Sequence, residues 1–216
     1  MMQPEKKYTF LLSVTLLMYV TFGLLTSVIG VVIDRFQAEY KVSLAVAALL
    51  PFAFFLAYGL TSIPFGMLMD KYGAKFVLLT GTVLMSAGSL LCYFSNNYII
   101  VIISVFLIGI GVTAVQIAGN PFIRVLDAPS RYTANLTMVI GVGALGYALS
   151  PLIVPMLQVN GFSWKAIYLL VAVVNIVILL IVTFSQFPEV KADQEEKIDL
   201  SKVWTLFRHP IVCTYG

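Results

Sequence analysis

The stretch of sequence that decides the fold is Gly66-Met67-Leu68-Met69-Asp70-Lys71-Tyr72-Gly73-Ala74-Lys75. It is a short polar joint between two long apolar runs, residues 42–69 and 76–94. A helix that crosses a bilayer needs roughly 20 mostly apolar residues, so each run predicts one membrane span. Gly73 can form the tight turn between them because it has no Cβ to clash with the backbone. We therefore expect two antiparallel neighbouring helices here.

Outward from this pair, further apolar runs complete a predicted set of six spans, at 10–33, 42–69, 76–94, 98–126, 133–157 and 163–187. The chain has 216 residues, of which 60% are hydrophobic and 11% charged. Soluble domains are about 45–50% apolar and about 25% charged, so these proportions exclude a soluble or a disordered chain. Two cysteines exclude a disulfide scaffold, and a net charge of +3 excludes a nucleic-acid-binding surface. We expect an all-α membrane protein.

Lysine and arginine set the predicted orientation, because loops on the cytoplasmic side are richer in both. With the N-terminus inside, the inner loops hold Lys6, Lys7, Lys71, Lys75, Arg124 and Arg131, and the outer loops hold only Arg35, Lys41 and Lys165. We expect an inner-membrane protein with both termini in the cytoplasm. Residues 1–9 then form an N-terminal tail, 10–187 a six-helix domain, 188–207 a cytoplasmic linker and 208–216 the start of a truncated seventh span.

No acidic residue lies inside a predicted span, and the single histidine, His209, lies in the tail. Hydrolytic, transfer and metal-dependent chemistry needs such groups to activate a nucleophile or to hold a metal. We therefore expect no enzyme active site, no metal and no cofactor within the spans.

The joint at residues 66–75 closely resembles the signature G-x-L-x-D-[RK]-x-G-x-[RK] of the major facilitator superfamily. The resemblance implies one half of a transporter, built as two inverted repeats of three helices. It also implies a conformational gate at the cytoplasmic side, with Asp70 as the switch residue and Arg124 as its partner. From the residues themselves, Gly66 is expected to allow close helix approach. The implied gate residues are Gly66, Asp70, Lys71, Gly73, Lys75 and Arg124.

A second motif, Gln116-Ile117-Ala118-Gly119-Asn120-Pro121-Phe122, lies near the end of the fourth span. Pro121 removes one backbone donor and predicts a kink in the helix. Gln116 and Asn120 are four residues apart and therefore share one helix face. Because an amide both donates and accepts hydrogen bonds, the pair suits a neutral polar ligand such as a sugar. The alternative is that both amides hydrogen-bond within the bundle.

The same stretch, together with Asn135-Leu136-Thr137, resembles the sugar/proton symporters of that superfamily, the fucose and glucose/galactose permease group. This resemblance implies transport of a monosaccharide and adds Asn135 to the residues that bind it. Since it also implies that spans one and four line the pathway, Ser27 in the first span is a further candidate. Tyr58 in the second span is another, with a packed aromatic as its alternative role.

A single six-helix domain offers only half of a site of this kind. We therefore expect the chain to be the N-terminal half of a longer transporter, whose partners are a small-molecule solute, the lipid bilayer and a second six-helix domain. Three alternatives stay open. They are a half-transporter that acts with a separate partner, a six-span binding or assembly protein, and a drug or organic-solute exporter of the same superfamily.

Overall fold

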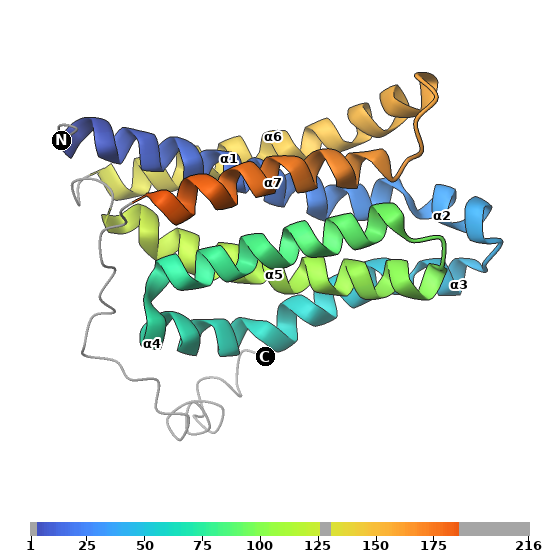
Figure 1. Ribbon diagram of the computed structural model, residues 1–216, viewed down its shortest axis with the longest axis horizontal. Helices are drawn as coiled ribbons and strands as arrows, with labels where there is room; N and C mark the ends of the chain where they lie inside the picture. Colours follow the sequence, from blue (N-terminus) through green and yellow to red (C-terminus); the bar gives the residue numbers. More distant parts are fainter. Residues whose placement is uncertain (1–3, 126–130, 186–216) are drawn as a thin grey trace, which may run out of the picture.

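The computed structural model describes residues 4–125 and 131–185, and all regular structure in these two ranges is helical (Figure 1). The helices are α1 (Pro4–Val31), α2 (Ile33–Tyr40), α3 (Leu44–Ala47), α4 (Leu49–Phe94), α5 (Tyr98–Val125), α6 (Tyr132–Val159) and α7 (Ala166–Phe184). The predicted linker at 188–207 and the predicted seventh span lie outside the described residues.

Five helical segments of the described chain are long and apolar enough to cross a bilayer. One of them, Leu44–Phe94, has 51 residues, which is enough for two crossings of roughly 20 residues each. Gly73 interrupts α4 with φ 81° and ψ 165°, and Figure 1 shows α4 folding back on itself. The six predicted spans are therefore present, and two of them lie within α4.

Two predicted joints turn out to be largely helical. In the joint at 70–75 only Gly73 departs from helical geometry, so the flanking charged residues lie in helical turns. The joint at 34–41 is mostly helix α2, which follows a one-residue break at Val32. This helix forms because Phe36 is fully buried against the bundle while Glu39 stays at its surface. It ends where Lys41 adopts a left-handed conformation.

The bundle has two ends, which we name by residues. The Gly73 end holds the turn within α4 and the last residues of α7. The Glu39 end holds α2, the turn between α4 and α5, and the turn before α7 (Figure 1). The long helices run between these two ends, so any polar side chain near their middle lies at bilayer depth.

The helices pair in a pattern that reveals two repeats. Helix α1 packs mainly on α6, and α4 packs mainly on α5 and then on α7. The first pair joins spans one and five. In the second, Gly109 of span four lies against Phe54 of span two, and span three packs on span four as well. If spans one, two and three are exchanged with spans four, five and six in that order, the contact of span one with span five becomes the contact of span four with span two. This exchange is what two inverted repeats of three helices require, so the predicted fold class is confirmed.

Both of these helix pairs meet through glycines. A Cβ built on Gly146 of α6 would lie 2.2 Å from the carbonyl oxygen of Val20 on α1, and one built on Gly23 would lie 2.3 Å from that of Gly143. In the other pair, a Cβ on Gly109 of α5 would lie 2.6 Å from the carbonyl oxygen of Phe54 on α4. Small residues allow membrane helices to approach this closely. We call these contacts the α1–α6 seam and the α4–α5 seam.

Candidate functional site

The two amides predicted from the sequence lie on α5, the helix that packs along α4. Gln116 and Asn120 are both partly exposed, whereas most of their neighbours on α5 are buried. Pro121 also lies within α5, and it cannot donate a backbone hydrogen bond to the carbonyl of Ile117. The helix continues to Val125; the kink at Pro121 stays a prediction.

Each amide oxygen accepts a hydrogen bond from a tyrosine on another helix. The hydroxyl of Tyr58 on α4 donates to Oε1 of Gln116. The hydroxyl of Tyr19 on α1 donates to Oδ1 of Asn120 at 2.5 Å. The alternative role for these amides was hydrogen bonding within the bundle. Their oxygens do bond within the bundle, to Tyr58 and Tyr19. Among the described residues, neither amide nitrogen has a hydrogen-bond partner.

Aromatic rings extend from Asn120 across the α1–α6 seam. The ring centroids of Tyr19 and Phe22 are 6.0 Å apart, and those of Phe22 and Tyr147 are 5.9 Å apart. Ser27, a predicted site residue, donates to the backbone carbonyl of Tyr147 at 3.0 Å. The site therefore combines amide groups with aromatic faces, the composition that ligand pockets for small molecules commonly have.

The structure brings several predicted site residues together. Tyr58, Gln116 and Asn120 form one group, and Ser27 joins it through the row of aromatic rings. Asn135 lies half-buried on α6, and its place in the site stays a prediction.

Sequence reasoning missed Tyr19, which is only 4% exposed. A signal was present, because Tyr19, Gly23 and Ser27 recur every four residues and so share one stripe of α1. Tyr19 lies between the apolar residues Met18 and Val20, so no local motif set its hydroxyl group apart as part of a site.

The predicted gate residues lie at the Gly73 end. Asp70 and Lys71 are exposed, and Gly73 adopts the left-handed φ that its predicted turn requires. Within the described chain no other helix comes within 4 Å of the position that a Cβ on Gly66 would take, so close helix approach at Gly66 stays a prediction. The side chain of Arg124 lies outside the described part of the chain, so the Asp70–Arg124 pair stays a prediction.

Lys75 has a role that its sequence position did not indicate. Its Nζ donates to the carbonyl oxygens of Thr183 and Ser185, at 3.1 Å and 2.8 Å. Both carbonyls belong to the C-terminal end of α7, where backbone acceptors lack helical partners and a cation is favourable. Lys75 therefore fastens the start of span three to the end of span six.

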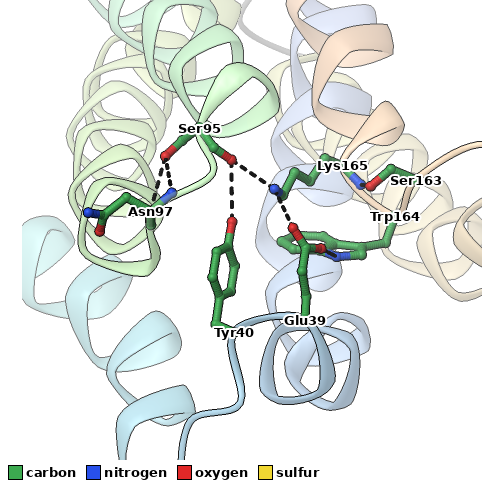
Figure 2. Close-up of polar contacts among 7 residues, drawn as sticks. All are labelled: Glu39, Tyr40, Ser95, Asn97, Ser163, Trp164 and Lys165. Atoms are coloured by element: carbon green, nitrogen blue, oxygen red, sulfur yellow. Dashed lines mark hydrogen bonds and ion pairs between the residues drawn. The ribbon is translucent and has the colours of Figure 1, made fainter.

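A cluster of polar side chains joins three helices at the Glu39 end (Figure 2). Nζ of Lys165 lies 2.6 Å from Oε1 of Glu39 and donates to the carbonyl oxygen of Ser95 at 2.8 Å. Tyr40 donates to the same carbonyl at 3.3 Å, and Nε1 of Trp164 donates to Oε2 of Glu39 at 2.5 Å. We call these five residues the Glu39 cluster. It ties the ends of α2 and α4 to the start of α7.

The cluster keeps Lys165 charged although its side chain is only 6% exposed. Burial lowers the pKa of Lys165, but the contacts with Glu39 and Tyr40 outweigh burial and raise that pKa above its ordinary value. Burial also raises the pKa of Tyr40. These groups form a structural ion pair far along the helices from the α5 amides.

Together, the two-repeat bundle of six apolar spans and the group of amides on α5 define a polytopic membrane protein with a candidate binding site between its helices. The family model of the Major Facilitator Superfamily matches residues 15–214. The chain belongs to this superfamily, as the motif at residues 66–75 indicated.

Its relatives are transporters. The glucose/galactose transporter of Brucella abortus is 23% identical over 227 residues, which cover 98% of this chain and 55% of the relative. The L-fucose-proton symporter of Escherichia coli is 29% identical over 111 residues, covering 49% of this chain and 25% of the symporter. The crystal structure of the transporter FucP in the outward conformation matches with a TM-score of 0.72 at 18% identity, over 94% of this chain and 56% of FucP. The chain thus spans about half the length of the transporters it matches most fully.

Proposed function

We propose that the protein carrying this chain moves a monosaccharide across the cell membrane by alternating access, and that the chain supplies one of its two six-helix domains. The observation that carries this proposal is the pair of partly exposed amides, Gln116 and Asn120, whose nitrogens have no partner in the described chain. Beside them lie the aromatic faces of Phe22 and Tyr147. Relatives described as glucose/galactose and fucose transporters support a sugar as the solute.

Within the proposed site, Gln116 and Asn120 bind the sugar directly, and Tyr58 and Ser27 lie at its edge. Asn135, which lies on α6, completes the proposed site as the resemblance implies. In this proposal the solute is carried across the membrane without chemical change, and the site needs no nucleophile, metal or cofactor.

A second six-helix domain is the proposed partner of the exposed faces of α4 and α6. Large apolar side chains stand exposed on the first half of α4 and along α6, among them Phe55, Ile63, Leu145 and Leu152. Such a face must lie against lipid or against protein. Because the matched transporters are about twice as long as the matched region, we assign part of this face to the second domain.

We also propose the orientation and the gate. The excess of lysine and arginine at the Gly73 end supports an orientation with that end and the N-terminus in the cytoplasm. Asp70 and Lys71 are exposed there, where a second domain could reach them. In this proposal the motif at residues 66–75 closes the cytoplasmic gate, with Arg124 as the partner of Asp70.

The proposal is tested by uptake of labelled D-glucose, D-galactose and L-fucose into cells that express the whole protein. Asn120→Ala should lower the initial uptake rate about tenfold or more, equivalent to losing roughly 1.4 kcal/mol of binding. Asn96→Ala is the matched control, because Asn96 is an exposed amide at the Glu39 end. Membrane insertion, measured by immunoblot of the membrane fraction, should be equal for both variants.

Normal uptake by Asn120→Ala would contradict the assignment of the site. Absence of any sugar uptake by the unaltered protein would contradict the proposed function. Export of an apolar compound would then favour the drug-exporter alternative, and co-purification with a partner without any solute flux would favour a binding or assembly role.

A further inference from the structure

The oxygen of the Asn120 amide is held by a tyrosine that has no other use for its proton. Tyr19 is 4% exposed, and a buried hydroxyl proton without an acceptor is costly. The acceptor available to it is Oδ1 of Asn120, at 2.5 Å. If the amide turned over, its NH₂ group would face the hydroxyl and the tyrosine proton would lose its acceptor. The amide is therefore held with its oxygen toward α1 and its nitrogen away from Tyr19.

Gly119 makes this contact possible. A Cβ at position 119 would lie 2.9 Å from both Cε2 and the hydroxyl oxygen of Tyr19. The tip of the tyrosine ring thus lies directly on the α5 backbone, one residue from the amide that it binds. The rest of the ring packs with Ile123 and Val139, which fixes its direction.

The amide of Gln116 has the same orientation, with its oxygen bound by a tyrosine of another helix, α4. The hydroxyl of Tyr58 donates to Oε1 of Gln116. Both amides therefore use their oxygens within the bundle, and both leave an NH₂ group without a partner among the described residues. An NH₂ group can only donate, so the exposed part of this site offers up to four N–H donors.

We propose that Tyr19 and Tyr58 are positioning residues, which turn the amides of Asn120 and Gln116 so that the site binds the acceptor oxygens of its solute. This inference rests on the proposed function, because it takes the two amides as the sugar site. Its consequence is a chemical selectivity. The site recognises the lone pairs of a sugar hydroxyl and is indifferent to the proton of that hydroxyl.

Deoxy and deoxyfluoro sugars separate these two properties. Fluorine in place of a hydroxyl group keeps lone pairs and loses the proton, whereas hydrogen in that place loses both. We would measure the inhibition of labelled hexose uptake by each deoxy and deoxyfluoro analogue of the transported hexose. At one ring position or more, the deoxy analogue should inhibit about tenfold more weakly than the parent, and the deoxyfluoro analogue within about threefold of it. If every deoxyfluoro analogue is as weak as its deoxy counterpart, the proposal is wrong.

Two variants release the Asn120 amide without removing it. Tyr19→Phe deletes the hydroxyl group, and Gly119→Ala places a Cβ 2.9 Å from the hydroxyl oxygen of Tyr19, so that the end of the ring must shift away from α5. In both, the amide can turn and offer its oxygen, so the inhibition by the deoxyfluoro analogue should fall to that of the deoxy analogue. Tyr98→Phe is the matched control, because Tyr98 is exposed at the Glu39 end. An unchanged ratio of the two inhibition constants in both variants would overturn the positioning role.

A second measurement tests the contact without any solute. The unfolding midpoint of the purified whole protein is compared for Tyr19→Phe, Asn120→Ala and the double variant. If the two groups are paired, the double variant should lose clearly less than the sum of the single losses. Additive losses would refute the pairing even in a protein that transports no sugar. Coupled losses without sugar uptake would instead leave the pairing standing and contradict the proposed function.

Discussion

Adding one methyl group to the α1–α6 seam should destabilise the bundle. In Gly146→Ala, the new Cβ would lie 2.2 Å from the carbonyl oxygen of Val20, 2.8 Å from the nitrogen of Leu24 and 3.1 Å from Cα of Gly23. All three are backbone atoms of α1, so no side chain can turn aside to make room. Since non-bonded carbon contacts are favourable only near 3.5–4.0 Å, α6 must move away from α1 by about 1 Å.

The expected cost follows from this displacement. Overpacking a well-packed interior costs about 1–3 kcal/mol. Each kcal/mol lowers the unfolding midpoint by about 2–4 °C in a chain of 150–250 residues, and by about half as much in a chain twice as long. Since the whole protein carries a second domain in our proposal, we expect the midpoint of Gly146→Ala to fall by roughly 1–6 °C. The change should also lengthen the hydrogen bond between Ser27 and the carbonyl of Tyr147, which crosses the same seam.

Gly141→Ala is the control for helix propensity. Gly141 lies on the same helix, is exposed, and has no atom within 4 Å of the position of a Cβ. Both variants gain the same methyl group in a helix, so the difference between their midpoints reports the seam alone. The measurement is thermal unfolding of the whole protein in detergent, followed by tryptophan fluorescence. Equal midpoints for Gly146→Ala and Gly141→Ala would refute the argument from backbone contact.

The remaining predictions concern the two ends of the bundle. Lys75→Met should lower the unfolding midpoint through the loss of about 0.5–1.5 kcal/mol of charge-assisted hydrogen bonding to the end of α7, and Lys41→Met, at an exposed site of the Glu39 end, should leave it unchanged. Gly73→Ala forces an alanine into a left-handed conformation and should cost about 1–3 kcal/mol, whereas Gly66→Ala should stay within about 0.5 kcal/mol of the unaltered protein; similar midpoints would count against the turn. Because the folded-state pKa of Lys165 is raised, its stabilising contribution is complete below the ordinary value of 10.5 and is lost as pH rises through the raised value. Between pH 9 and pH 12 the midpoint should therefore fall more steeply for the unaltered protein than for Lys165→Met, and parallel curves would contradict the role of this ion pair.

The six spans were predictable because each is a continuous apolar run, and bilayer thickness fixes how long such a run must be. The turn at Gly73 was predictable as well, since glycine adopts the positive φ of a tight reversal without a Cβ clash. The helical state of residues 33–40 was not evident, because its charged residues suggested a loop. Only the burial of Phe36 against the bundle decides the matter.

The arrangement of the candidate site was predictable in part for a related reason. Spacing along one helix places Gln116 and Asn120 on a common face, whatever the rest of the fold. Their tyrosine partners come from α1 and α4, and no local pattern relates helices so far apart in sequence. The Glu39 cluster escaped prediction in the same way, because Lys165 and Glu39 meet only when α7 returns to the Glu39 end. The role of Gly66 stays a prediction, because a glycine within a span suggests close packing and the described chain has no neighbouring helix at that position.

The two seams have a consequence for the order in which the protein is made. Each joins a helix from the first three spans to one from the last three, and a chain is synthesised from its N-terminus. When α1 and α4 enter the bilayer, the helices α6 and α5 that later pack against their backbone have not yet been synthesised. The early helices must therefore be stable in lipid one by one, on their own apolarity, until α5 and α6 arrive. A charge added to α1 should then act during insertion, before any contact of the finished bundle can compensate for it.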